Sequence, residues 1–187
     1  MPDPHAALKA TTMLTRFALA LGFSMLAVNS MAQEYKTGLN GPAADEISRY
    51  IEQTQIDCYK MEGESKCRIA ETAGQSKVFY GAFEASRDLY ALAFLTYQSD
   101  TTGNAVDQMA VLFKQEGTGW KAVSRANNTI GTDPYDVRFG KAGAITFTGT
   151  AVGPNDSRAN PTGRLTSQLN LTEKGLVFVK GKWRGRQ

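Results

Sequence analysis

The first apolar pattern downstream of residue 40 has the spacing of a helix. Ile47, Tyr50 and Ile51 recur at intervals of three and four residues, which places them on one helix face. Pro42 precedes them, and proline is favoured at a helix start because its missing N–H would have no partner there. The pattern therefore predicts one helix over residues 43–55.

The remainder of the chain has the pattern of strands. Short runs of β-branched and aromatic residues alternate with turn-forming segments, among them 116–119 and 127–134. Two of the runs, 89–97 and 106–115, are apolar enough to form the centre of a sheet. The predicted fold class is α+β, mostly β, with one N-terminal helix followed by an antiparallel meander that forms a curled sheet, a barrel or a sandwich. The predicted strands are 66–70, 77–80, 89–97, 106–115, 120–126, 144–152, 164–171 and 176–180.

The N-terminal 32 residues have the build of a secretory signal peptide. Arg16 supplies a positive start, residues 17–28 form an apolar core, and Ser30-Met31-Ala32 is a small-residue cleavage site. The apolar core is shorter than the roughly 20 residues that a membrane-spanning helix needs. We therefore expect a signal peptide over 1–32, with Met13 as an alternative start, and one exported domain over 33–187 that is periplasmic or secreted and soluble after cleavage.

The charge of the exported domain is close to balanced. Removing residues 1–32 takes away Lys9, Arg16 and Asp3, which leaves 19 basic and 17 acidic residues. So small a net charge gives no general attraction to nucleic acid.

Both cysteines, Cys58 and Cys67, belong to the exported domain. An oxidising compartment favours a disulfide between them, and Glu62-Gly63 midway between them suits a turn that joins two short antiparallel segments. The alternative is a redox-active or metal-binding pair, but eight intervening residues match neither a CxxC motif nor a zinc knuckle.

The available side chains exclude several catalytic mechanisms. The one histidine of the chain, His5, lies in the predicted signal peptide. Histidine-dependent triads and HExxH zinc sites are therefore excluded from the exported domain, and no phosphate-binding loop motif is present. We expect no cofactor and no metal, and a non-enzymatic role is favoured.

A pair of carboxylates is the enzymatic option that remains, because glycoside hydrolysis needs two acids beside the scissile bond. The candidate pair is Glu84 and Asp88, although surface acids of a turn would give the same pattern. Asp133 and Asp136 have the pattern of turn formers around Pro134.

Aromatic and basic residues suggest two contact points for a partner. Trp120, at the start of a predicted strand, is either an exposed stacking residue or part of the core. The C-terminal tail is either a solvated end or a contact for an anionic surface, through charge combined with an aromatic ring. The residues of this tail are Lys180, Lys182, Trp183, Arg184 and Arg186.

Several segments together resemble a loose group of small exported bacterial β-rich proteins of unassigned function. They are VFYGAF (78–83), DLYALAF (88–94), AVLF (110–113), GTGW (117–120), DVRFGKAGAITFT (136–148) and GPNDSRANPTG (153–163), within a resemblance that spans 77–171. The resemblance implies an exported β-rich domain and no particular activity. Members often have an acidic loop and paired cysteines where this chain has residues 82–87, Ala159 and Asn160, so no calcium site is implied.

Export, small size and the missing catalytic groups favour a non-catalytic periplasmic binding protein. It would act on another envelope component, a protein or a glycan, as an inhibitor, an immunity-type protein or an assembly factor. The alternatives are a small carboxylate-dependent hydrolase of an envelope glycan, and a small-ligand carrier with an apolar cavity inside the curled sheet.

Overall fold

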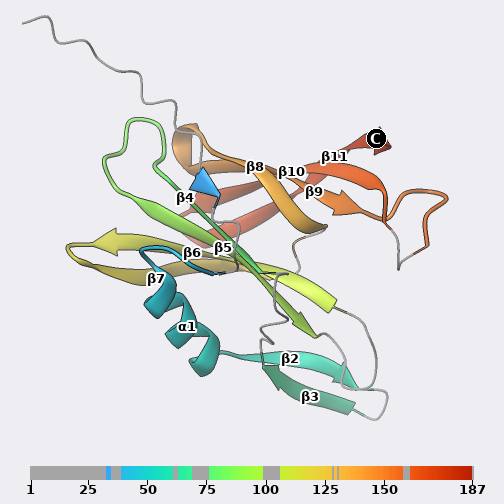
Figure 1. The fold of residues 1–187 in the computed structure, drawn as a ribbon, viewed down its shortest axis with the longest axis horizontal. Helices are drawn as coiled ribbons and strands as arrows, with labels where there is room; N and C mark the ends of the chain where they lie inside the picture. Colours follow the sequence, from blue (N-terminus) through green and yellow to red (C-terminus); the bar gives the residue numbers. More distant parts are fainter. Residues whose placement is uncertain are drawn as a thin grey trace, which may run out of the picture.

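The structure, a computed structural model, describes residues 33–34, 39–60, 63–68, 76–98, 106–127, 129, 131–157 and 161–186. Its strands form two antiparallel sheets and a separate hairpin (Figure 1). The central sheet has the order β1 (Gln33–Glu34), β4 (Lys77–Gly81), β5 (Tyr90–Gln98), β6 (Val106–Glu116) and β7 (Gly119–Ala126). The outer sheet has the order β11 (Gly175–Arg186), β10 (Gly163–Thr172), β9 (Ala144–Ala151) and β8 (Thr132–Phe139). The hairpin is β2 (Gln55–Lys60) with β3 (Gly63–Arg68), and the 3₁₀ turn η1 (Lys141–Gly143) joins β8 to β9.

The central sheet is covered on both faces. One face packs against the outer sheet, where Leu92 and Phe94 of β5 meet Ile145, Phe147 and other apolar residues. The opposite face packs against the helix α1 (Ala44–Gln53). Every residue of β5 from 90 to 97 is therefore buried, which explains why this strand appears in the sequence as one continuous apolar run.

The helix α1 lies beside the central sheet (Figure 1). The predicted apolar stripe of the helix packs against that sheet. Ile47 is fully buried, and the ring of Tyr50 meets that of Phe113 edge to face at 5.7 Å between centroids. The backbone N–H of Ala43 donates a hydrogen bond to the hydroxyl of Tyr80 at 3.0 Å, which fixes the start of the helix to β4.

The predicted fold class is confirmed, with a sandwich as the form that the meander takes. The helix and the central strands agree closely with the sequence pattern, whereas β11 continues past the predicted end at residue 180 to Arg186. One prediction is wrong: the segment 127–134 is not a turn throughout, because β8 begins at Thr132. The sequence pattern predicts no strand over 132–139, where the structure has β8.

The predicted hairpin around the cysteines is present as β2 and β3. Their register places Cys58 opposite Ser65 and Cys67 opposite Ile56, so the two cysteines are diagonal neighbours instead of direct partners. Their side chains lie outside the described part of the structure, and the disulfide stays a prediction.

The predicted signal peptide, residues 1–32, also lies outside the described residues. Within the described part of the chain, no helix is long and apolar enough to cross a membrane.

The contact between the two sheets can be tested at Gly81, the last residue of β4. A Cβ atom at this position would overlap the ring of Phe139, which is fully buried on β8. We expect Gly81→Ala to lower the free energy of unfolding by about 1–3 kcal/mol, because the ring has no free space to move into.

The matched control is Gly119→Ala on β7, where the nearest atom to the new methyl group would be the Glu116 carbonyl oxygen at 3.9 Å. Denaturant unfolding of both variants measures the difference. Equal stability of the two variants would contradict the close approach of β4 and β8.

Candidate functional site

The strand β8 has an irregular register that determines which side chains it presents. Thr132, Tyr135 and Arg138 pair with Thr150, Thr148 and Thr146 of β9. Three residues of β8 therefore match two residues of β9, twice in succession, so each interval contains a bulge with one extra residue. Residues three apart consequently lie on one face of the sheet.

Each bulge contains an aspartate in the left-handed backbone region. Asp133 has φ 50° and Asp136 has φ 51°, and aspartate enters this region more readily than most residues with a side chain. At the first bulge, the Nζ of Lys77 on β4 lies 2.7 Å from a carboxylate oxygen of Asp133 and donates to the Pro134 carbonyl at 3.3 Å. The predicted turn-forming aspartates thus shape a strand, and the first one ties it to the central sheet.

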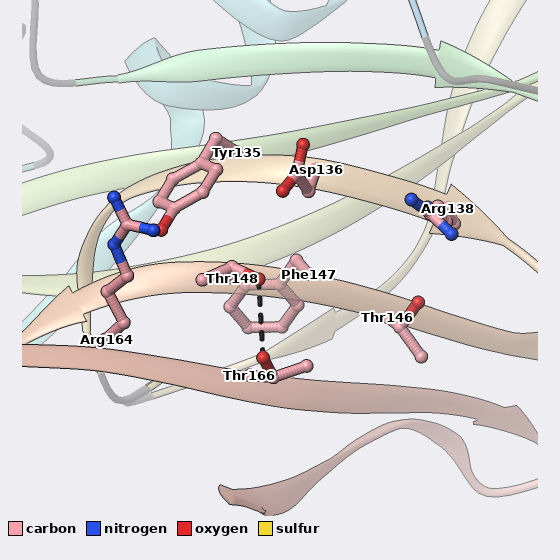
Figure 2. Close-up of a pocket in the computed structure, with 8 residues that line it drawn as sticks. All are labelled: Tyr135, Asp136, Arg138, Thr146, Phe147, Thr148, Arg164 and Thr166. Carbon is pink, nitrogen blue, oxygen red and sulfur yellow. Dashed lines mark hydrogen bonds between the residues drawn. The ribbon is translucent and has the colours of Figure 1, made fainter. Parts of the chain in front are cut away.

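A pocket of about 480 Å³ lies on the outer sheet, where the side chains of β8, β9 and β10 converge (Figure 2). We call it the arginine pocket. Its volume falls within the range of small-molecule sites. The residues that line it are Tyr135, Asp136, Arg138, Thr146, Phe147, Thr148, Arg164 and Thr166.

The charge of the arginine pocket is predominantly positive. The guanidinium of Arg164 lies over the Tyr135 ring, 6.0 Å from its centroid, while Arg138 stands at the opposite end of the pocket (Figure 2). Neither arginine forms a salt bridge with any residue that the structure describes. Asp136 is the one acid among the lining residues.

Threonine hydroxyls line the pocket between the two arginines. The Oγ1 atoms of Thr148 and Thr166 lie 3.4 Å apart, within hydrogen-bond distance, and Thr146 follows on the same face of β9 (Figure 2). Lys182 of β11 pairs directly with Thr166 in the register, so this exposed lysine adds a further positive charge on the same sheet face. The arrangement offers charged and neutral hydrogen-bond donors to a polar, negatively charged ligand.

The predicted acid pair lies elsewhere. A carboxylate oxygen of Asp88 lies 2.7 Å from the Nζ of Lys114, and one of Glu84 lies 3.7 Å from the Nζ of Lys141. The hydrogen bond to Asp88 raises the pKa of Lys114. Both acids are about half exposed, and neither lines the arginine pocket.

The predicted aromatic and basic contacts separate in space. Trp120 is half-buried and meets Tyr80 edge to face at 5.6 Å between centroids, on the face of the central sheet that α1 covers. The C-terminal tail is part of β11, paired with β10. Lys182 therefore lies beside the pocket, whereas the side chains of the remaining tail residues lie outside the described part of the structure: Lys180, Trp183, Arg184 and Arg186.

Among the described residues, no group of three or more histidine, cysteine, aspartate or glutamate side chains is placed to hold a metal ion. Comparisons of the chain with protein-family models, with curated proteins and with solved structures found no match. The geometry of the arginine pocket is therefore the main basis for a functional proposal.

None of the residues that line this pocket was predicted from the sequence as a site residue. The threonines of β9 alternate with Ile145 and Phe147, and this alternation does predict one polar sheet face. Tyr135 and Arg138 could not be assigned to that face, because in a regular strand residues three apart point in opposite directions.

The bulge at Asp136 generates a test of the pocket's scaffold. We expect Asp136→Val to destabilise the protein by about 1–2 kcal/mol, because a β-branched residue is strained at positive φ. Asp136→Gly should be tolerated, since glycine adopts this conformation readily.

Arg138→Val, on the same strand and outside the left-handed region, is the control for introducing valine. Denaturant unfolding compares the three variants. If Asp136→Val were no more destabilising than Arg138→Val, the bulged geometry of β8 would be wrong.

Proposed function

We propose that this protein is a non-catalytic binding protein that acts on another component of the cell envelope through the outer face of its outer sheet. The observation that carries the proposal is the arginine pocket, in which Arg138 and Arg164 stand without salt bridges to described residues beside a row of threonine hydroxyls. Arginines arranged in this way favour capture of an acidic group, because the guanidinium forms paired hydrogen bonds with carboxylate or phosphate.

The place of action rests on the sequence. The predicted signal peptide over 1–32 supports a periplasmic or secreted protein, and in that compartment Cys58 and Cys67 are proposed to form a disulfide. The role would be that of an inhibitor, an immunity-type protein or an assembly factor, each of which requires capture without chemistry.

Binding fits the site better than glycan hydrolysis does. Glycoside hydrolysis requires two carboxyl groups about 5–9.5 Å apart beside the substrate. Asp136 is the one carboxylate among the residues that line the arginine pocket. Glu84 and Asp88 lie outside the pocket, and each forms an ion pair with a lysine.

A carrier for an apolar ligand is also less well supported. The space between the two sheets is filled by aromatic side chains, among them Phe94 and Phe147, whose ring centroids are 4.8 Å apart. The arginine pocket lies on the outer face, and two arginines, an aspartate and three threonines are among the residues that line it, which suits a polar ligand or partner.

Partner capture tests the proposal. The protein, purified without residues 1–32, would serve as bait in periplasmic extract of the producing organism, with bound proteins and glycans identified by mass spectrometry. We expect one saturable component, and the double variant Arg138→Glu with Arg164→Glu should weaken its capture by about tenfold or more, because acidic groups are repelled.

The matched control is the double variant Lys121→Glu with Arg125→Glu on β7, which reverses two exposed charges on the central sheet. Capture that is lost with the control as well would indicate a general charge effect. Capture that survives the double variant would remove the arginine pocket from the proposal.

The positive charges of the C-terminal tail can be tested separately from the arginine pocket. Lys182 lies at the margin of the pocket through its pairing with Thr166, and Arg184 follows it on β11. We expect reversal of both charges to weaken capture by about two- to fivefold, as is usual for charges at the rim of an interface. The association rate and its dependence on salt would be measured by surface plasmon resonance, and unchanged capture would exclude the tail from the interface.

A further inference from the structure

We infer that the arginine pocket binds an acidic saccharide, a short sugar chain or sugar derivative carrying carboxylate or phosphate groups. This inference rests on the proposed function and names the chemical class of its ligand. Three properties of the pocket support it. Its positive charges are separated, threonine hydroxyls lie between them, and the backbone groups of β9 and β10 beneath it are already hydrogen-bonded within the sheet.

The two arginines of the pocket lie on different strands and in different rows of the sheet. Arg138 of β8 pairs with Thr146 of β9, whereas Arg164 of β10 pairs with Thr150 of β9. The two arginines are therefore two strands apart, and their rows are four residues apart along the strand direction. With a rise of about 3.3 Å per residue and about 4.8 Å between strands, their Cα atoms are roughly 16 Å apart. Figure 2 shows the two side chains at opposite ends of the pocket. A ligand that contacts both guanidinium groups in these positions therefore carries two separate acidic groups.

The side chains in the middle of the pocket are suited to hydrogen bonds with hydroxyl groups of a ligand. Thr146 and Thr148 present hydroxyls to the ligand, and the Thr148 hydroxyl also shares a hydrogen bond with that of Thr166. Asp136, beside them on β8, accepts hydrogen bonds only, which a sugar hydroxyl can donate. Acidic groups at the ends and hydroxyls between them describe an acidic saccharide.

An acidic peptide fits this location less well. A bound peptide commonly gains its affinity by adding a strand to an open sheet edge. Beneath the pocket, β9 is paired with both β8 and β10, and β10 with both β9 and β11. The backbone groups of β9 and β10 are thus engaged within the sheet. The edge strand β8 pairs with β9 alone, and its two bulges interrupt the regular hydrogen-bond spacing that an added strand needs.

Isothermal titration calorimetry with defined probes tests the inference. Trigalacturonate supplies carboxylates and glucose 1,6-bisphosphate supplies phosphates, so the two probes distinguish the sources of negative charge. Maltotriose is the neutral control and hexaglutamate the acidic peptide control. We expect saturable binding of at least one acidic sugar and none of maltotriose at the same concentration.

Three variants connect the binding to the pocket. Arg138→Gln and Arg164→Gln should each weaken binding of the acidic sugar by about tenfold, because each removes a charge-assisted pair of hydrogen bonds. Thr148→Val, which keeps the side-chain shape and removes the hydroxyl, should weaken it by about threefold or more. Arg125→Gln is the control that removes a charge elsewhere, and circular dichroism confirms folding of every variant.

The outcomes separate this inference from the proposed function. Equal binding of maltotriose, tighter binding of hexaglutamate, or no binding of either acidic sugar overturns the ligand class. If capture from extract is still lost with Arg138→Glu and Arg164→Glu in that case, the proposed function stands with another ligand. If capture is indifferent to those charges as well, both proposals fail.

Discussion

The packing of aromatic rings between the two sheets is the interaction on which the rest of the structure depends. Phe94 of the central sheet meets Phe147 of the outer sheet at 4.8 Å between ring centroids, and Phe79 and Phe178 extend the contact on either side. Each fully buried aromatic side chain contributes roughly 1.5–3 kcal/mol relative to an exposed one. The outer sheet is held by this one face, and its opposite face is left for polar side chains.

The different positions of the two sheets explain where a binding site can form. The central sheet is covered by α1 on one side and by the outer sheet on the other, so its strands β4 and β5 present few side chains to solvent, whereas the edge strand β7 keeps alternate residues exposed. The outer sheet alternates buried and partly exposed residues along β9 and β10. Polar side chains accumulate on its exposed face because they keep their contact with water there, and two strained residues in β8 turn that face into a pocket.

The candidate site combines one sequence-predicted residue with several that the sequence did not indicate. Lys182 was expected to contact a partner, and the pairing of β11 with β10 places it beside Thr166. The sequence allows Trp120 to be either an exposed stacking residue or part of the core. Its half-buried ring contacts that of Tyr80, which agrees with a core role. The acid pair Glu84 and Asp88 consists of exposed residues, each in an ion pair with a lysine distant in sequence. Such long-range partners have no local signal in the chain.

The sequence by itself determined the elements whose side chains follow a regular period. The stripe of Ile47 and Tyr50 gave the helix, and the continuous apolar run of β5 gave a strand covered on both faces, because burial selects apolar residues wherever it occurs. Only the tertiary structure decided β8 and the pocket. Asp133 and Asp136 break the period of two with left-handed residues, and local sequence leaves open whether such residues make a turn or a bulge. The neighbouring strand decides between them, because pairing with β9 supplies the register that brings Tyr135 and Arg138 to one face.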